Sequence, residues 1–146
     1  MKATMSMSPP RDPIAALNQT LSEVIDEVLE VKQARWIVPE AHALHGQLDQ
    51  LFDDLGTWAR LLFEQDDALG VSPLASMPSV AGRERPNLRR GAATDEEIRR
   101  IVGEHLDRLE QHVAAALAEQ EDDRLRTALG EVVRGLLAQR EVFRER

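Results

Sequence analysis

The chain contains no cysteine and no tyrosine, and aromatic side chains make up only 3% of its 146 residues. Without cysteine, neither disulfides nor thiolate metal sites can form. The scarcity of aromatic residues disfavours strands, because aromatic and β-branched side chains are their usual formers, whereas abundant Ala and Leu favour helices. An apolar share of 42% is enough for one core. These features indicate an all-α protein of a single domain.

Long apolar runs are also missing, since none approaches the roughly 20 residues of a membrane span. The N-terminal sequence MKATMSMSPPRDP lacks the apolar core of a signal peptide. Basic residues are in the minority, with 18 Lys and Arg against 26 Asp and Glu, and the formal net charge is −8. Phosphate backbones repel such a surface. We therefore expect a soluble, cytoplasmic protein that binds neither membrane nor DNA.

Apolar residues recur in steps of three and four, which predicts four amphipathic helices. Asp12-Pro13 is an N-cap followed by a proline at the first helical position, and Thr94 with Glu97 forms a capping box. We expect the helices to cover about residues 13–36, 39–69, 95–119 and 124–143. Gly70 ends the second helix, and residues 71–93 form a long connection. The pattern predicts a flexible tail at residues 1–13 and a ferritin-like four-helix bundle at residues 14–146, with a long crossover loop between helices 2 and 3.

The periodicity also assigns side chains to the core and to the surface. The second helix is expected to turn eight apolar residues inward: Leu44, Leu48, Leu51, Phe52, Leu55, Trp58, Leu62 and Phe63. Three of them, Leu48, Leu55 and Leu62, form a second apolar edge that suggests burial between subunits. The fourth helix carries a further apolar series: Leu125, Leu129, Val132, Val133, Leu136, Leu137 and Phe143. We interpret Trp36 and Trp58 as core or interface residues, Asp66-Asp67 as a solvated helix end, and His105 and His112 as packing residues.

The stretch from His45 to Gly70 contains the chain's most suggestive polar pattern. His45 and Asp49 are four residues apart, as are Arg60 and Glu64, so each pair lies about 40° apart on the helix surface. Helices that carry carboxylates and histidines in this way build metal sites in ferritin-like bundles. Arg60 is the anomaly, because a cation lies where such a site would need another anion.

This stretch resembles the Dps family of mini-ferritins (DNA-binding proteins from starved cells). The family's helix pair typically carries a histidine-tryptophan, a turn proline, a leucine-histidine, three spaced acids and a closing leucine-glycine. The matching residues here are Trp36, Pro39, Leu44-His45, Asp49, Glu64 and Leu69-Gly70. The resemblance runs from about residue 14 to the end of the chain. It implies a hollow homododecamer that stores iron, with a ferroxidase site between two subunits.

Two of the family's ligands are replaced by arginine, because Arg35 occupies the first histidine position and Arg60 an aspartate position. By resemblance, one subunit would contribute Arg35, His45 and Asp49, and its neighbour Arg60 and Glu64. The two arginines cancel the two carboxylates, and arginine cannot bind a metal. His45, Asp49 and Glu64 remain as possible ligands. In competition with metal, Arg35 and Arg60 can form ion pairs with the two carboxylates.

Three functions stay open. The first is a Dps-like shell that binds and stores iron, its ferroxidase activity weakened or lost, so that enzymatic activity is undecided. The alternative is a non-enzymatic Dps-like structural or stress-protection assembly without metal at the inter-subunit site. An iron ion and an empty position are equally plausible at that ferroxidase position. The third is a plain helical-bundle interaction protein. His42 lies one turn before His45, and we interpret it as a surface residue. Whether the arginines of residues 83–90, the only basic cluster, contact a partner is undecided.

Overall fold

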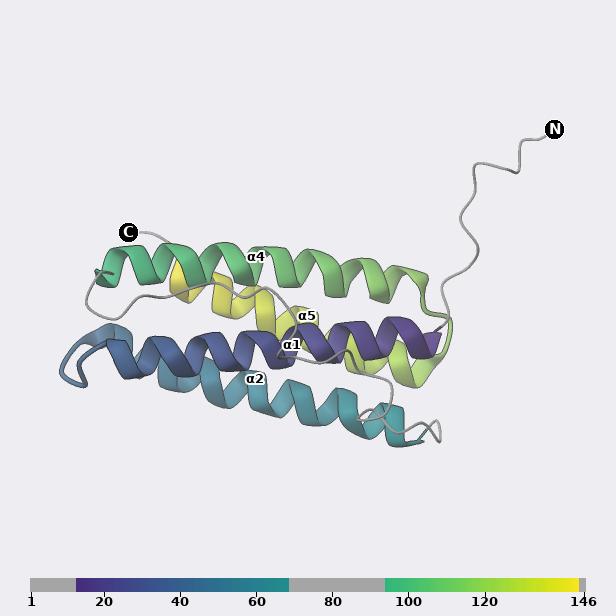
Figure 1. Ribbon diagram of the computed structural model, residues 1–146. Helices are drawn as coiled ribbons and strands as arrows, with labels where there is room; N and C mark the ends of the chain where they lie inside the picture. The colour runs from purple at the N-terminus through teal and green to yellow at the C-terminus, as the bar shows by residue number, and fades with distance from the viewer. Residues whose placement is uncertain (1–12, 69–93, 145–146) are drawn as a thin grey trace.

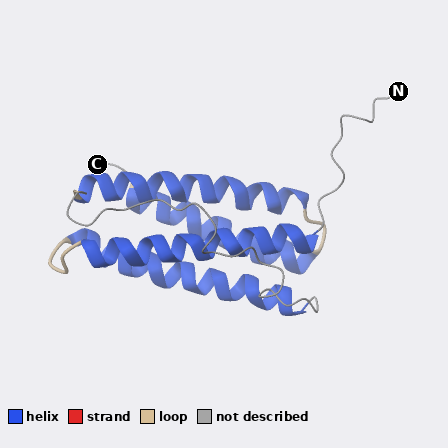
Figure 2. Ribbon diagram, in the orientation of Figure 1, coloured by secondary structure: helices blue, strands red, loops and turns tan. Residues whose placement is uncertain are grey.

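The computed structural model describes residues 13–68 and 94–144, and the regular structure in these ranges is entirely α-helical (Figure 2). The helices are α1 (Pro13–Ile37), α2 (Ala43–Ala68), α4 (Asp95–Glu119) and α5 (Asp123–Phe143). α1 packs against α2 and α4, and α5 packs against the same two helices, which produces a four-helix bundle (Figure 1). The predicted all-α bundle is confirmed for this part of the chain.

The helices alternate in direction around the bundle. α1 is antiparallel to α2 and to α4, and α5 is antiparallel to α4 (Figure 1). α2 ends and α4 begins at opposite ends of the bundle, as a long connection between them requires. The predicted crossover loop itself, the N-terminal tail before Pro13, the N-cap Asp12, the helix-ending Gly70 and the arginines of residues 83–90 lie outside the described residues.

The helix starts of the second half follow their capping sequences. At α4, the Glu97 backbone N–H donates to Thr94 Oγ1 over 3.1 Å, and the Thr94 N–H donates to Glu97 Oε1 over 2.8 Å. This confirms the predicted capping box. At α5, Asp122 Oδ1 accepts the backbone N–H groups of Arg124 and Leu125. Both caps satisfy backbone donors that the first helical turn leaves unpaired.

The second helix begins later than the sequence suggests. The expected start at Pro39 is wrong, because α2 begins at Ala43. The His42 N–H donates to the Pro39 carbonyl over 3.0 Å, which closes a tight turn before the helix, and the His45 N–H donates to the His42 carbonyl over 3.0 Å in the helix's first turn. The chain thereby reverses between α1 and α2 within five residues, which brings the end of α1 beside the start of α2.

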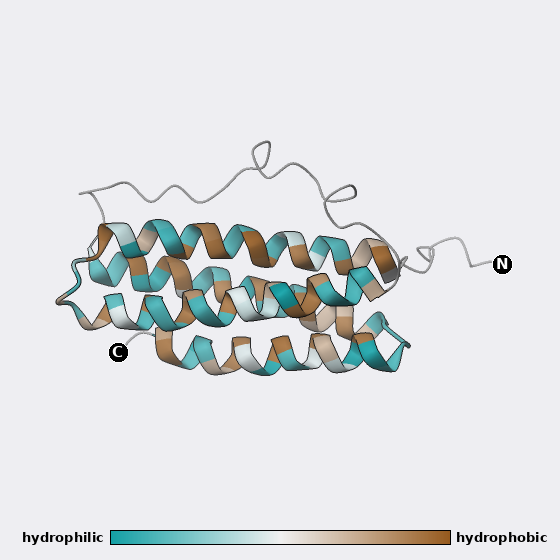
Figure 3. Ribbon diagram, turned by 90° about the horizontal axis from the view of Figure 1, so that it is seen from below, coloured by the Kyte–Doolittle hydropathy of each residue, from teal (hydrophilic) through white to brown (hydrophobic). Residues whose placement is uncertain are grey.

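The core lies along the axis of the bundle and is built mainly from leucine and valine. Hydrophobic and hydrophilic residues alternate along the helices (Figure 3), as in helices that turn one face inward. Leu48, Leu55 and Leu62 are fully buried within the single chain, so they do not form the outward second edge that was expected. Phe63 is 42% exposed, so the expectation that it points inward is wrong, and Leu137 of the apolar series of α5 is 43% exposed. None of the described helices is both long and apolar enough to cross a membrane.

A glycine allows the closest approach between α2 and α5. A Cβ atom built on Gly135 of α5 would lie 2.1 Å from Cζ2 of Trp58, whose indole is almost completely buried. No real side chain tolerates that distance, so the indole packs there only because residue 135 has no side chain. Trp58 is therefore a core residue, which is one of the two placements predicted for it, and Gly135 provides the space for its indole.

Candidate metal centre

The first half of the predicted Dps-like site is assembled where α1 meets the start of α2. Arg35 Nε lies 2.5 Å from Asp49 Oδ1, and His45 Nδ1 lies 3.6 Å from Asp49 Oδ2. The Arg35 guanidinium also stacks over the ring of Phe52, 5.0 Å from its centroid. Asp49 thus has a cation and an imidazole as neighbours, in the arrangement that the ion-pair hypothesis describes.

The second half lies further along α2 and is open to solvent. Arg60 Nε is 3.9 Å from Glu64 Oε2, and both side chains are mostly exposed. Arg60 is eleven residues beyond Asp49, about 16 Å along the helix, so the two halves are separate within one chain. His42 is exposed as expected, and its Nδ1 lies 2.8 Å from Asp95 Oδ2. The proposed metal role of His45, Asp49 and Glu64 remains a prediction.

Trp36, near the end of α1, and Asp66, near the end of α2, differ from expectation. Trp36 is 64% exposed, so it is not a core residue, and Lys32 Nζ lies 5.6 Å from the centre of its ring. Asp66 is fully buried and not the solvated helix end that was predicted. Its burial raises the pKa of the Asp66 carboxyl. An aromatic side chain is thus exposed at the end of α1 and a carboxyl is buried at the end of α2, and neither placement follows from hydrophobicity alone.

A second polar cluster lies at the interface of α1 and α4. Glu27 and Glu30 are one turn apart on α1, and His105 faces them from α4. The potential ligand atoms of these three residues all lie within 4.8 Å of one another. His105 Nδ1 is 2.5 Å from Glu30 Oε2. Both glutamates are buried, with 8% and 3% of their surface exposed. We call this group the inner site.

The inner site has fewer hydrogen-bond partners than its burial demands. Glu27 Oε2 and Glu30 Oε1 are buried and accept no hydrogen bond from the protein. Burial raises the pKa of Glu27 well above its usual value, and the hydrogen bond and negative charge of Glu30 raise it further, against a smaller opposing effect of Arg108. Glu27 is therefore held in its protonated form at pH values where an exposed glutamate is ionised.

The charge and donor set of the inner site suit a divalent cation. Two ionised carboxylates and one neutral imidazole around a divalent ion form a neutral assembly, which removes the cost of burying two like charges. Mixed oxygen and imidazole ligands are typical of first-row divalent ions such as Mn(II), Fe(II) and Zn(II). Ligands at about 2.0–2.2 Å from one tetrahedral ion are about 3.3–3.6 Å apart. The potential ligand atoms here lie within 4.8 Å of one another, so the side chains would close in by up to about 1.5 Å on binding.

The inner site borders a groove that opens to solvent. The groove has a volume of about 190 Å³ and is lined by Glu27, His105 and five neighbours, which are Glu23, Asp26, Arg108, Leu109 and His112. His112 Nδ1 lies 3.3 Å from Glu23 Oε2. In addition to the packing predicted for them, His105 and His112 each place Nδ1 next to a glutamate oxygen of α1.

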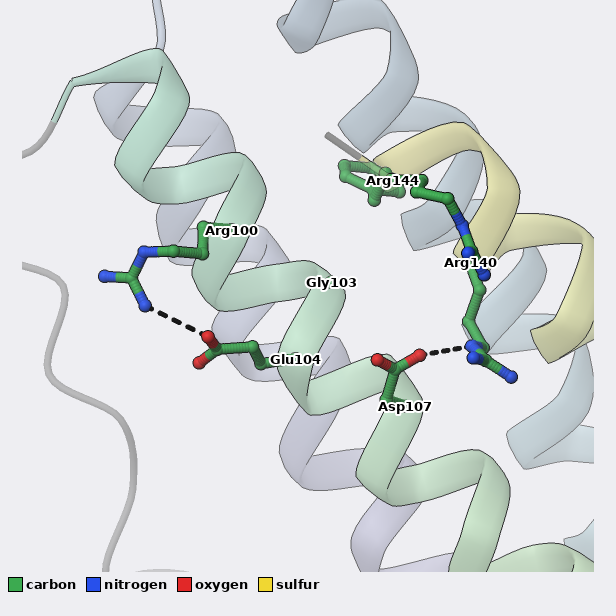
Figure 4. Close-up of a pocket in the computed structure, with 7 residues that line it drawn as sticks. Arg100, Gly103, Glu104, Asp107, Arg140 and Arg144 are labelled. Atoms are coloured by element: carbon green, nitrogen blue, oxygen red, sulfur yellow. Dashed lines mark hydrogen bonds and ion pairs between the residues drawn. The ribbon is translucent and has the colours of Figure 1, made fainter. Parts of the chain in front are cut away.

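A hollow of about 330 Å³ between α4 and α5 is a weaker candidate (Figure 4). Its arginines have partners within the protein: Arg100 Nη1 lies 3.1 Å from Glu104 Oε2, and Arg140 pairs with Asp107. In Figure 4 each pair joins two residues that both line the hollow. An anion would have to break these pairs, so we assign no ligand to this hollow.

The sequence contained a signal for the inner site that polarity alone did not reveal. Glu23, Glu27 and Glu30 are spaced as i, i+4 and i+7 and therefore share one face of α1. His105 and His112 are also seven residues apart and share one face of α4. Each series reads as an ordinary helix surface by itself. Only the packing of α1 on α4 shows that the two series face each other.

In comparisons with known proteins, no protein-family model, no curated protein and no solved structure matches the chain. The resemblance to the Dps family rests on the residues of α1 and α2 described above.

Proposed function

We propose that this protein binds a first-row divalent metal ion inside each helical bundle, with Glu27, Glu30 and His105 as ligands. The observation that carries the proposal is the pair of buried carboxylate oxygens, Glu27 Oε2 and Glu30 Oε1, that lack a partner beside a histidine. A buried carboxylate oxygen without a hydrogen bond is costly, and a bound cation would satisfy both atoms. The resemblance to the Dps family implies iron handling. We propose it here as iron binding at the inner site of each chain, in place of a site between two subunits.

Metal titration of chelator-treated protein tests the proposal. We expect calorimetry with Mn(II), Zn(II) and, without oxygen, Fe(II) to show one ion per chain for at least one metal. At a free-ion concentration one hundred times the Kd, binding should stabilise the fold by about 2.7 kcal/mol. For a chain of this length that raises the Tm by about 9 °C. The affinity should rise with pH because Glu27 releases its proton on binding.

Four variants locate the site. Glu27→Gln and His105→Gln should abolish binding, since each removes a ligand from the inner site. Glu104→Gln is the matched control: it removes one negative charge from an exposed position of α4 and should bind as the parent does. His45→Gln tests the remnant site between α1 and α2. Binding that survives Glu27→Gln and is lost in His45→Gln would refute the inner site and return the metal to the Dps-like position.

A second function is favoured by one specific observation. The 2.5 Å contact between Arg35 and Asp49 supports a non-enzymatic role for the Dps-like position, because a metal there would first have to break that ion pair. In this proposal the chain forms a Dps-like assembly without ferroxidase chemistry between subunits. Light scattering should then give a mass about twelve times the 16.4 kDa of one chain. A monomer at micromolar concentration would reject it.

A further inference from the structure

The groove beside the inner site continues into a second hollow along the same helix pair. The second hollow has a volume of about 310 Å³ and lies further toward the start of α1, lined by Gln19, Thr20, Glu23, His112 and Ala115. Glu23 and His112 line both hollows. The two hollows therefore meet at the contact between Glu23 and His112, which we call the outer pair.

The outer pair repeats the chemistry of the inner site at a fixed distance. Glu23 and Glu30 are seven residues apart on α1, and His112 and His105 are seven residues apart on the antiparallel α4. The Glu23–His112 pair consequently lies two helical turns, about 10.5 Å, from the Glu30–His105 pair. Between the two pairs lies Glu27.

Solvent contact decreases from the outer pair to the inner site. The side chains of His112 and Glu23 are 52% and 22% exposed, whereas those of His105 and Glu30 are 16% and 2% exposed. A cation can thus meet the outer pair while it keeps most of its water. It reaches the inner site only after it has lost that water.

The charges along this route favour a cation. Glu23 and Asp26 line the groove, Glu27 adds a third carboxylate once it releases its proton to the incoming ion, and Arg108 is the groove's single permanently charged cation. Clefts lined by one sign of charge concentrate the opposite ion. The route also ends at an atom that lacks a partner, because Glu27 lines the groove and its buried Oε2 accepts no hydrogen bond.

We propose that the Glu23–His112 pair is a transient binding position through which a divalent ion passes along the α1–α4 groove to the inner site. This inference rests on the metal binding proposed above. The outer pair holds the partly hydrated ion, and the ion then moves two helical turns inward to Glu27, Glu30 and His105. Glu23 and His112 thus set the rate of uptake, and the inner site sets the affinity.

Stopped-flow uptake of Zn(II) or Mn(II) by the full-length, metal-free protein tests this role. The double variant Glu23→Gln with His112→Gln should load about tenfold or more slowly, within the range by which charged clefts accelerate association. Its Kd should stay that of the parent, so release into excess chelator should slow by the same factor. Raised ionic strength should slow the parent more than the variant. Glu104→Gln removes one charge from α4 outside the groove and should load at the parent's rate.

The outcomes separate this inference from the function it rests on. Normal uptake rates in the double variant, together with tight binding by the parent, overturn the access route and leave the inner site intact. A Kd that weakens in step with slower uptake, with release unchanged, also overturns it, because the pair would then act only by attraction at a distance. A parent that binds no divalent ion overturns both proposals.

Discussion

Glu27 should reduce the stability of the metal-free protein at neutral pH, and replacing it should recover that loss. The side chain is buried between α1 and α4, and two causes raise its pKa: first the burial, then the neighbouring Glu30. In Glu27→Gln the amide keeps the shape of the protonated carboxyl and can still donate a hydrogen bond to Glu30. The variant therefore imitates the protonated state at every pH. We expect it to be more stable than the parent at pH 7 when a chelator is present.

The sign and size of the effect follow from proton linkage. An unfolded glutamate ionises around its ordinary pKa of 4.5, whereas folded Glu27 still holds its proton there. Unfolding then releases a proton, so the parent loses stability as the pH rises from 4.5 to the raised pKa, by at most about 1.4 kcal/mol per pH unit. The advantage of Glu27→Gln should thus be small near pH 4.5, grow with pH, and become constant above the folded pKa.

Urea unfolding of both proteins between pH 4.5 and 8, with chelator, measures this difference. Glu104→Gln is the control, because an exposed glutamate in an i, i+4 pair contributes only about 0.3–0.5 kcal/mol. With a saturating divalent ion the order should reverse, since only the parent retains the full ligand set. A stability difference that does not change with pH would refute the reasoning. It would show that Glu27 is ionised in the folded protein as readily as in the unfolded chain.

Three further predictions concern other parts of the chain. Gly135→Ala should destabilise the fold by about 1–3 kcal/mol in urea unfolding, because the new methyl group meets the Trp58 indole; Gly56→Ala, with open space around it, should stabilise by about 0.5–1 kcal/mol. The parent should oxidise iron(II) hardly faster than buffer, and Arg35→His with Arg60→Asp together should speed oxidation if the Dps-like geometry persists; an inert double variant would show that the backbone has diverged. Duplex DNA should not be retarded in gels at physiological salt, because the formal net charge is −8; salt-sensitive retardation would contradict this.

The parts of the fold that local chemistry determines were predictable from the sequence. Thr94 and Glu97 cap each other whatever lies nearby, so the start of α4 could be read directly. Errors arose where two neighbouring apolar residues competed for one face. Leu62 and Phe63 lie about 100° apart on the helix, and only Leu62 points to the core.

The inner site could not be predicted, because it depends on contacts between residues far apart in the sequence. Glu30 and His105 are 75 positions apart and meet only through the packing of α1 on α4. The Dps-like residues could be grouped from the sequence because His45 and Asp49 are neighbours on a single helix. Periodicity identifies residues that share a face of one helix, whereas the partner of that face depends on tertiary packing.

The location of the inner site separates metal binding from assembly. A Dps-like centre needs residues from two subunits, so dilution to monomers would destroy it. The inner site draws all three ligands from α1 and α4 of one chain. A monomer and an assembly should therefore bind the ion with the same Kd. An affinity that falls on dilution, in step with the loss of assembly, would place the metal between subunits.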